Sequence, residues 1–347
     1  MKKLVDRLVN DHTLDAEEYR NLINGCDDQT LAYLRNEAVR TARKQFGQNI
    51  YIRGLIEISS ICRNDCLYCG LRRSNASAQR YRLSDTQIME CCSRGYAAGF
   101  RTFVLQGGED PAFSDERLCS LIRRIKSGYP DAAVTLSLGE RQEESYQKLY
   151  EAGGDRYLLR HEAADRHLYE AIHPEDMSWS NRLDCVRSLK RTGFQTGTGM
   201  MAGVPGQTVD SIVEDLLFME EIKPEMIGIG PFIPHKDTPL GHHSAGSFKL
   251  TVMLTAMARL MFPKALIPVT TALATLSPEG RRAGILSGAN VIMPNLSPVE
   301  VRDSYSIYEG KVCRGAESAE GMALLEKELR TIGYETDYSR GDHYDWI

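Results

Sequence analysis

The chain has 347 residues, which is enough to bury a sizeable core in one large domain or two ordinary ones. Its 42% hydrophobic and 26% charged residues are typical of a globular protein and exclude extensive disorder. A net charge of −5 argues against a nucleic-acid partner, because nucleic-acid-binding proteins usually carry a basic domain or stripe. We therefore expect small-molecule or protein partners and no nucleic acid.

No targeting segment is expected at the N-terminus. Asp6, Arg7 and Asp11 interrupt the apolar run that a signal peptide would need, and no stretch of the sequence is apolar for long enough to span a bilayer. We expect no membrane association and a cytoplasmic location. The nine cysteines are an odd number for a disulfide framework. Five of them lie in helix-like segments and are interpreted as reduced structural thiols: Cys26, Cys91, Cys92, Cys119 and Cys185.

The spacing of apolar residues changes along the chain, from a helical period to alternating strand-like and helical segments. Helical periodicity over 15–46 predicts an N-terminal helical extension, residues 1–48. About eight strand–helix units then predict an α/β fold, a (β/α)8 TIM barrel over residues 49–310, and residues 311–347 are expected to form a C-terminal helical segment that closes the barrel. A doubly wound sheet is the alternative, disfavoured because no glycine fingerprint opens the first unit. The predicted strands are 51–60, 102–106, 133–138, 156–160, 195–200, 226–230, 267–272 and 290–293.

Polar clusters follow the first four predicted strands. A cysteine-rich loop follows the first strand, and the later clusters span 106–110, 137–140 and 160–162. Barrel enzymes build their sites at this carboxyl end of the strands. The clusters therefore predict one active site at the mouth of the barrel.

One face of the first predicted strand is unusually polar. Arg53, Glu57 and Ser59 share one face, although barrel interiors are normally filled by branched apolar residues. We interpret this face as the wall of a polar lumen, which implies a polar ligand or mutual pairing because unpaired buried charges are costly. The alternative is that Arg53 and Glu57 only pair with each other in the wall.

Three thiols stand within eight residues in the loop after the first strand, at Cys62, Cys66 and Cys69. Thiolates so closely spaced indicate a soft metal centre, and iron–sulfur clusters and zinc are the usual occupants. A closed zinc site needs four protein ligands, and the sequence has no second Cys-x-x-Cys pair. The pattern favours a site with one open position, and an enzyme with one bound zinc is the alternative.

The Cys-x3-Cys-x2-Cys spacing, with Tyr68 before the last cysteine, resembles that of the radical S-adenosylmethionine (SAM) enzymes. The resemblance implies that Cys62, Cys66 and Cys69 hold a four-iron four-sulfur cluster whose open iron takes the amino and carboxylate groups of SAM. Electron transfer then cleaves SAM to a 5′-deoxyadenosyl radical. The resemblance also implies these SAM-binding positions: Tyr68, Gln106, Gly107, Gly108, Glu109, Ser137, Glu162, Arg182 and Met201.

Within that superfamily, five segments look like the FeFe-hydrogenase maturase HydE: 53–57, 69–73, 156–162, 230–235 and 288–295. The resemblance implies a role in assembling the di-iron subcluster of the hydrogenase. The implied substrate is a small cysteine-bound iron carbonyl cyanide species made by a partner maturase, and an electron donor is a further partner. Substrate contacts are assigned by position to Arg53, Thr270, Thr271, Ala272, Tyr305 and Tyr308.

Other interpretations stay open at the level of sequence. Methylornithine synthase, a carbon-skeleton mutase, and biotin synthase are similar, but the asparagine-rich signature of biotin synthase is replaced by Arg160-His161-Glu162. A scaffold that carries an iron fragment without cleaving SAM is also possible. Many relatives have three further cysteines near the C-terminus, whereas here Cys313 stands alone, so no second cluster is expected.

Overall fold

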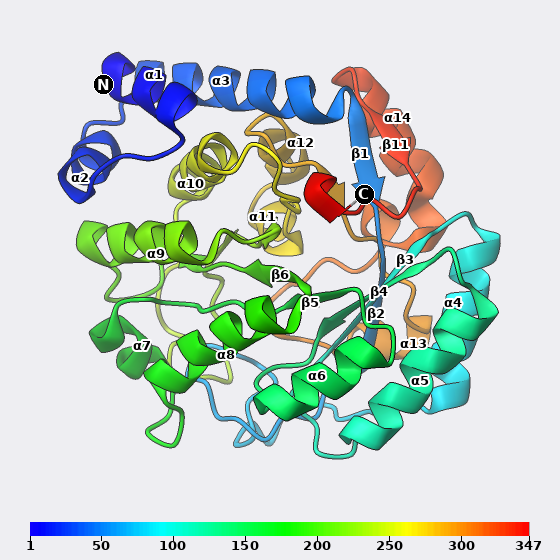
Figure 1. Cartoon of the computed structure of the whole chain (residues 1–347). Helices are drawn as coiled ribbons and strands as arrows, with labels where there is room; N and C mark the ends of the chain where they lie inside the picture. The colour runs from blue at the N-terminus through cyan, green and yellow to red at the C-terminus, as the bar shows by residue number, and fades with distance from the viewer. Residues whose placement is uncertain (347) are drawn as a thin grey trace.

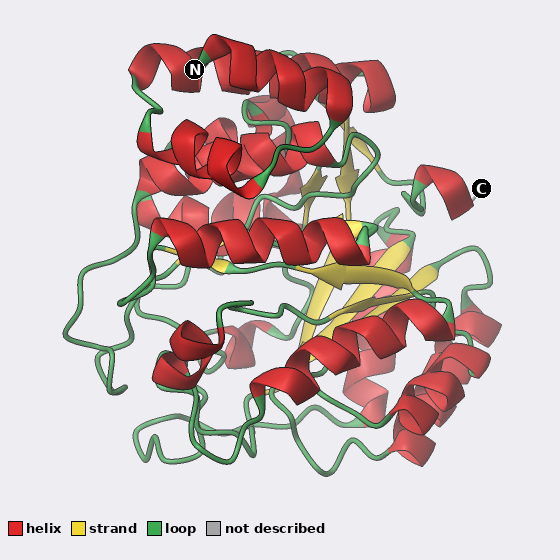
Figure 2. Cartoon of the chain, turned by 60° about the vertical axis from the view of Figure 1, so that its left-hand side comes forward, coloured by secondary structure: helices red, strands yellow, loops and turns green. Residues whose placement is uncertain are grey.

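A computed structural model of the chain describes residues 1–346. At its centre is a parallel sheet in the order β2-β3-β4-β5-β6-β8, and helices form a layer around it (Figure 1, Figure 2). None of the helices in the described range is both long and apolar enough to cross a bilayer. The sheet strands are β2 (Gly54–Ser59), β3 (Thr102–Gly107), β4 (Ala133–Ser137), β5 (Arg156–Leu158), β6 (Gln195–Thr198) and β8 (Met226–Ile227).

Short contacts close this sheet into a ring. The Ile227 amide donates to the Leu266 carbonyl at 3.1 Å, and the Val269 amide donates to the Val291 carbonyl at 2.9 Å. Strand β10 (Val291–Ile292) then pairs in parallel with β1 (Asn49–Ile52), which leads directly into β2. The predicted (β/α)8 barrel is confirmed. The strand predicted at 267–272 is wrong in its second half, because Thr270 caps a short helix, α11 (Thr271–Leu276).

Successive side chains along each strand lie in two different environments. The outward side chains, such as Ile56, Leu105 and Leu136, belong to the apolar core between the barrel and the helices. Their neighbours along the strands, such as Glu57 and Thr135, are buried polar groups on the opposite face. The polar lumen predicted from the first strand is therefore present.

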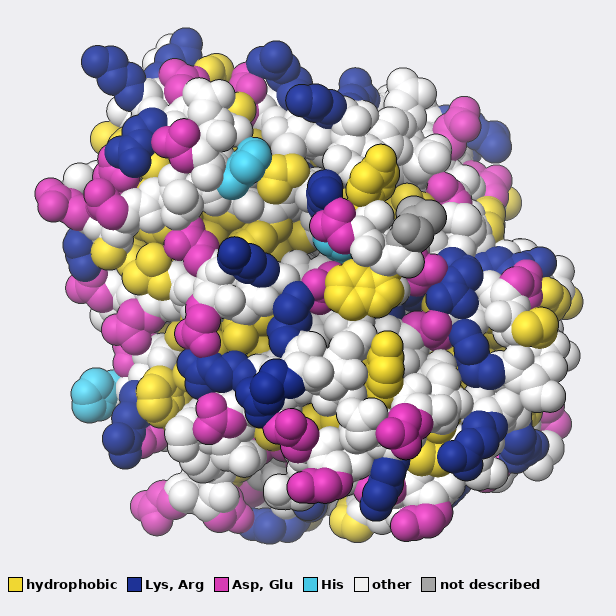
Figure 3. Space-filling model, in the orientation of Figure 1, with side chains coloured by type: hydrophobic (Ala, Val, Ile, Leu, Met, Phe, Trp, Pro, Cys, Tyr) yellow, Lys and Arg dark blue, Asp and Glu magenta, His cyan; other side chains and the backbone are white. Residues whose placement is uncertain are grey.

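The outer helices begin at polar caps. Ser84 and Thr208 form capping boxes, and Ser114 and Ser178 accept hydrogen bonds from backbone amides of the first turn. On the face shown in Figure 3, basic and acidic side chains are interspersed and do not gather into one basic stripe. The helices around the barrel are α4 (Asp85–Ala97), α5 (Asp115–Gly128), α6 (Glu143–Glu151), α7 (Arg166–Ile172), α8 (Trp179–Thr192), α9 (Val209–Ile222), α10 (Phe248–Met261), α12 (Gly280–Ile285) and α13 (Val299–Arg302).

Three helices precede the barrel: α1 (Lys2–Asp11), α2 (Ala16–Asn24) and α3 (Asp28–Phe46). The helix α3 runs beside α10, where Leu34 and Ala38 are buried (Figure 1). The predicted helical periodicity is confirmed, and the interruption between α2 and α3 falls at Gly25, which ends the first of them. Caps at Asp15 and Asp27 explain where α2 and α3 begin.

The C-terminal segment is less helical than expected. Two 3-10 turns, η1 (Gly315–Glu317) and η2 (Ala319–Gly321), lead into α14 (Met322–Thr331), and strand β11 (Glu335–Asp337) then pairs with β1. A final 3-10 turn, η3 (Tyr344–Trp346), ends the described chain. The helical part of the segment expected over 311–347 is thus α14, and residues 335–337 add a strand to the edge of β1.

The residues after β11 cover the amino-terminal end of the barrel. Arg156 is fully buried and its Nη2 lies 2.5 Å from Asp342 Oδ1. The Nη2 of Arg53 donates to the Gly341 carbonyl at 3.2 Å, so its guanidinium lies at this barrel floor. Arg53 and Glu57 therefore do not form the wall pair that the sequence left as an alternative.

Asp342 should carry much of the stability of this floor. Asp342→Asn leaves the buried Arg156 charge without its partner, and we expect a loss of about 3 kcal/mol in the free energy of unfolding by urea. Burial raises the pKa of Asp342, but the hydrogen bond from Arg340 and the charge of Arg156 outweigh it and lower this pKa to about 2. An unfolded aspartate has a pKa of about 3.9. The stabilisation by the Asp342–Arg156 pair is therefore fully present above about pH 4. It is lost as the pH falls through about 2.

Asp345→Asn is the matched control, because the Asp345–Lys264 pair is exposed and should contribute little. Equal destabilisation by the two variants would contradict the role given to Asp342.

Candidate active site

The three thiols lie in the loop that follows β2, at the carboxyl end of the barrel. All three cysteines are half-buried and none of them is in a disulfide. Neighbouring elements hold the loop: the Leu67 amide donates to the Ile172 carbonyl at 3.0 Å, and the Gly70 amide donates to the Ile307 carbonyl at 2.9 Å. The loop is thus fixed by segments far away in the sequence.

The environment of the thiols suits a cationic centre. Burial raises the pKa of Cys66 and Cys62, and it raises the pKa of Cys69 to about 12. Such thiols become thiolates only when a cation binds them, as coordinating iron does. Within residues 1–346, no three His, Cys, Asp or Glu side chains are close enough together to hold one metal ion.

The predicted glycine turn packs directly on the cysteine loop. A Cβ on Gly108 would lie 2.3 Å from the Ile61 carbonyl oxygen and 2.8 Å from the Cβ of Cys62. Only glycine permits so close an approach. The turn and the cysteines therefore form one unit.

Glu109 lies at the edge of the same unit. Its Oε1 accepts from the Glu140 amide at 2.9 Å, and its Oε2 accepts from Arg63 Nε at 3.0 Å. A Cβ on Gly139, where φ is +76°, would collide with this carboxylate. Glycine at position 139 therefore leaves room for the Glu109 side chain.

Glu162 places an unpartnered carboxylate oxygen at the site. It has a φ of +66°, an uncommon conformation for a residue with a side chain. Its Oε1 pairs with Arg160 Nη2 at 3.1 Å, whereas its Oε2 is buried without a hydrogen-bond partner in the structure. A buried carboxylate oxygen without a donor is costly, so a ligand with hydroxyl or amino groups fits here, and the ribose and amino groups of SAM are of this kind.

Arg182 is held close to Glu162. Its Nε donates to Glu140 Oε1 at 2.5 Å and its Nη1 donates to the Arg160 carbonyl at 3.0 Å. Arg160 and Glu140 were not among the predicted binding residues, and their proximity arises from pairing between strands that sequence alone does not specify. The arrangement fixes a guanidinium at the site, suited to an anionic group of a ligand.

An apolar patch lies beside these charges. Met201, on β7 (Met201–Ala202), packs with Val204 and Phe232, and Tyr68 lies against them. Strand β7 pairs with β9 (Gly230–Pro231). The apolar patch is buried and gives the half-buried ring of Tyr68 an apolar backing.

Tyr68 is oriented by a histidine that the sequence did not single out. Burial lowers the pKa of His173 to about 3, so its imidazole is neutral. Its Nδ1 lies 2.9 Å from the Tyr169 carbonyl, which can only accept, so Nε2 is the acceptor for the Tyr68 hydroxyl at 3.2 Å. His173 therefore fixes the aromatic ring beside the third cysteine.

The predicted substrate residues are not all together. Gln106 Nε2 donates to the Tyr305 hydroxyl at 3.4 Å near the mouth, where Ser137 is the strand partner of Gln106. Thr270 caps α11, Thr271 and Ala272 are its first two residues, and Tyr308 is half-buried. Arg53 lies at the barrel floor instead, beside Gly341. The binding roles of all these residues stay predictions.

Lys311 and Asn295 are polar lumen residues that sequence reasoning missed. Lys311 Nζ lies 2.5 Å from Glu57 Oε1, and Asn295 Nδ2 donates to Glu57 Oε2 at 2.8 Å. An isolated lysine gives no signal in the sequence. Its partner is 254 positions away.

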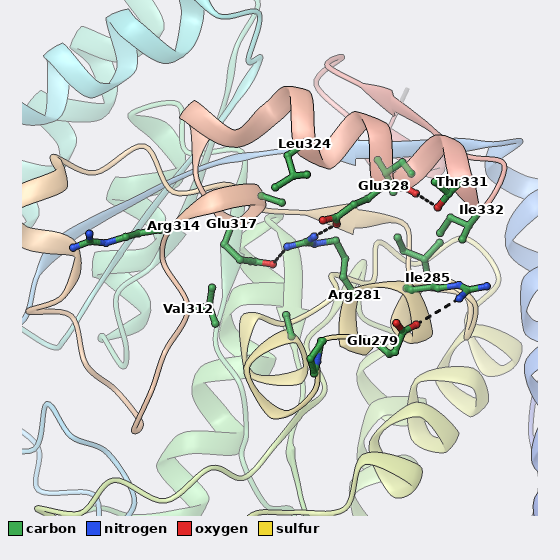
Figure 4. Close-up of a pocket in the computed structure, with 15 residues that line it drawn as sticks. Glu279, Arg281, Ile285, Val312, Arg314, Glu317, Leu324, Glu328, Thr331 and Ile332 are labelled. Carbon is green, nitrogen blue, oxygen red and sulfur yellow. Dashed lines mark hydrogen bonds and ion pairs between the residues drawn. The ribbon is translucent and has the colours of Figure 1, made fainter.

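A separate surface pocket of about 480 Å³ lies between α12 and α14 (Figure 4). Arg281 reaches across it to pair with Glu317 and Glu328. Val312 and Arg314 also line it. None of the three loop cysteines lines this pocket, so it is distinct from the site at the barrel mouth.

Glu162 provides a test of SAM binding. Glu162→Gln keeps the shape but removes the charge, and we expect at least about a tenfold weaker affinity because charge-assisted hydrogen bonds are the stronger kind. The measurement is anaerobic calorimetric titration of the cluster-loaded protein with SAM. Glu170→Gln, which removes a charge from an exposed helical ion pair, is the control. Unchanged affinity in Glu162→Gln would remove this residue from the binding site.

Comparison with known proteins agrees with this geometry. The Radical SAM superfamily is matched over residues 56–219, which include the cysteine loop and the glycine turn. The FeFe-hydrogenase maturase subunit HydE of Thermotoga maritima is 48% identical over 84% of this chain and 83% of that protein. The 3-methylornithine synthase of Methanosarcina acetivorans is 28% identical over 85% and 84% of the two chains.

Among solved structures, methylornithine synthase superposes with a TM-score of 0.84 at 25% identity, covering 96% of this chain and 97% of that one. The identity to HydE is much higher than the identity to either methylornithine synthase. The chain therefore belongs to the radical SAM superfamily, within the family of the FeFe-hydrogenase maturase HydE, and is an enzyme that uses a four-iron four-sulfur cluster and SAM.

Proposed function

We propose that this enzyme acts in the cytoplasm in assembling the di-iron subcluster of an FeFe-hydrogenase. Its substrate is a small cysteine-bound iron carbonyl cyanide species supplied by another maturase. The observation that carries the proposal is the 48% identity to HydE across most of both chains, combined with an intact cysteine loop. An electron donor is the further partner.

The residues of the mouth have separate tasks in this proposal. When bound, the cluster and SAM supply a 5′-deoxyadenosyl radical. Glu162 and Arg182 orient the ribose and carboxylate of SAM, and Glu109 lies within the unit that receives its ammonium. Met201 and Tyr68 pack on the adenine and exclude water from that side.

In this proposal the substrate binds in the barrel lumen. Arg53 is buried, its Nε has no partner in the structure, and it forms no ion pair, so an anionic ligand would compensate its charge. We place the organometallic substrate between this floor and the mouth. Its contacts there would come from Thr270, Thr271, Ala272, Tyr305 and Tyr308 in addition to Arg53.

A cell-free maturation assay tests the proposal. Apo FeFe-hydrogenase is incubated with the other maturases, SAM and a reductant, with or without this protein, and hydrogen evolution is measured. We expect hydrogenase activity only when the cluster-loaded protein is added. The protein lacking Cys62, Cys66 and Cys69 is the control and should give none.

Methylornithine synthase is the second candidate, because its structure superposes over nearly the whole of both chains. Incubation with SAM, a reductant and free amino acids, followed by mass spectrometry for methylornithine, distinguishes the two functions. Methylornithine formation without hydrogenase activation would overturn the maturase proposal.

A further inference from the structure

A loop of twelve residues, 303–314, crosses the barrel mouth between α13 and η1, and we call it the strap. The Ile307 carbonyl accepts from the Gly70 amide, and the Glu309 amide donates to the Pro234 carbonyl at 3.1 Å. A Cβ on Gly70 would lie 2.1 Å from the Ser306 carbonyl oxygen. The strap is therefore in direct contact with the cysteine loop, while its outer end lines the pocket of Figure 4.

One buried ion pair anchors the strap to the barrel. Lys311 Nζ lies 2.5 Å from Oε1 of Glu57; the Glu57 side chain is fully buried, and that of Lys311 is 8% exposed. Asn295 completes the hydrogen bonding of the carboxylate. Loss of one partner would leave the other charge buried and uncompensated, which is strongly unfavourable. The strap has an outer ion pair too, but Asp303 and Arg314 are about 70% exposed, and exposed pairs contribute little.

The anchor also positions an aromatic side chain. The ammonium of Lys311 lies 5.1 Å from the centre of the Tyr305 ring, and the Tyr305 hydroxyl contacts Gln106, the strand neighbour of Glu57. Gln106 directly precedes the glycine turn that packs on Cys62. Tyr305 thus lies between the ion pair and the cluster-binding unit.

We propose that Lys311 is a positioning residue of the radical site: its buried pair with Glu57 holds Tyr305 in place and keeps the strap closed over the cysteine loop. The role does not depend on which substrate the enzyme converts. Neither the predicted SAM contacts nor the predicted substrate contacts include Lys311.

The test compares variants of the cluster-loaded protein. Lys311→Met removes the ammonium, Lys311→Arg keeps a cation, and Arg314→Met removes the exposed pair of the same strap as a matched control. The readouts are hydrogen–deuterium exchange of the peptides that contain Gly70 and Glu309, and the electron paramagnetic resonance spectrum of the reduced cluster with SAM.

We expect Lys311→Met to speed exchange in both peptides by at least about tenfold and to change the spectrum. Lys311→Arg should restore both readouts, and Arg314→Met should change neither. Wild-type exchange and spectrum in Lys311→Met, or equal changes in Arg314→Met, would overturn the proposal.

If Lys311→Met does not fold, the double variant Glu57→Gln with Lys311→Met decides, because it leaves neither charge buried alone. The double variant should bind the cluster and still exchange faster in the strap contacts. Wild-type protection in that variant would overturn the proposal.

Discussion

Replacing Cys66 by alanine is expected to abolish SAM cleavage. Three thiolates would hold three irons of a four-iron cluster and leave one iron for SAM. The sulfur of Met177 lies 3.7 Å from Cys66 Sγ, but a thioether is too weak a ligand to replace the lost thiolate. The loss should exceed the roughly 10- to 100-fold that follows removal of a mere outer partner of a metal ligand. Iron and sulfide analysis and chromatography of 5′-deoxyadenosine measure it.

Cys119→Ser is the matched control for this experiment. Cys119 is also a buried free thiol, but it lies on α5 and donates to the Lys148 carbonyl at 3.4 Å, a bond that a serine hydroxyl can replace. The control should bind iron and cleave SAM as the wild type does. Retention of cleavage in Cys66→Ala would show that this thiol is not a cluster ligand.

Gly108→Ala should produce the second largest effect, through geometry rather than chemistry. The added methyl would collide with the backbone at Ile61 and with Cys62, so the glycine turn or the cysteine loop must move. Overpacking of this kind costs about 1–3 kcal/mol, and here the cost falls on the segment that positions a cluster ligand. We expect lower cluster content and weaker SAM binding, measured by iron analysis and calorimetric titration.

Gly128→Ala controls for the change of residue type, because a Cβ at Gly128, the last residue of α5, meets open space. It should be neutral or slightly stabilising, by at most about 1 kcal/mol. Normal cluster content and normal SAM affinity in Gly108→Ala would contradict the close packing of the turn on the cysteine loop.

The sequence predicted what depends on local pattern. Periodicity located α2 and α3, and alternation in β2 located the polar lumen face. Spacing singled out Cys62, Cys66 and Cys69, whose role as cluster ligands stays a prediction. These features are readable because a helix, a strand and a metal-binding loop each repeat or cluster within a few residues.

Features that depend on distant pairing could not be predicted. Arg156 meets Asp342 across 186 positions, and Glu57 meets Lys311 across 254, so single charges gave no sign of their partners. The positive φ of Glu162 is set by its tertiary surroundings, since nothing in its residue type requires it. Strands such as β10 are only two residues long and are completed by isolated bridges, which leave no periodicity to detect.

We expect Cys62, Cys66 and Cys69 to leave one iron of a cluster open to SAM. Electron–nuclear double resonance on the reduced, oxygen-free protein with SAM labelled by ¹⁵N at its amino group tests this directly. We expect a hyperfine coupling between the cluster and the labelled nitrogen. Saturating SAM with no such coupling, or a protein that retains zinc in place of iron under the same conditions, would contradict it.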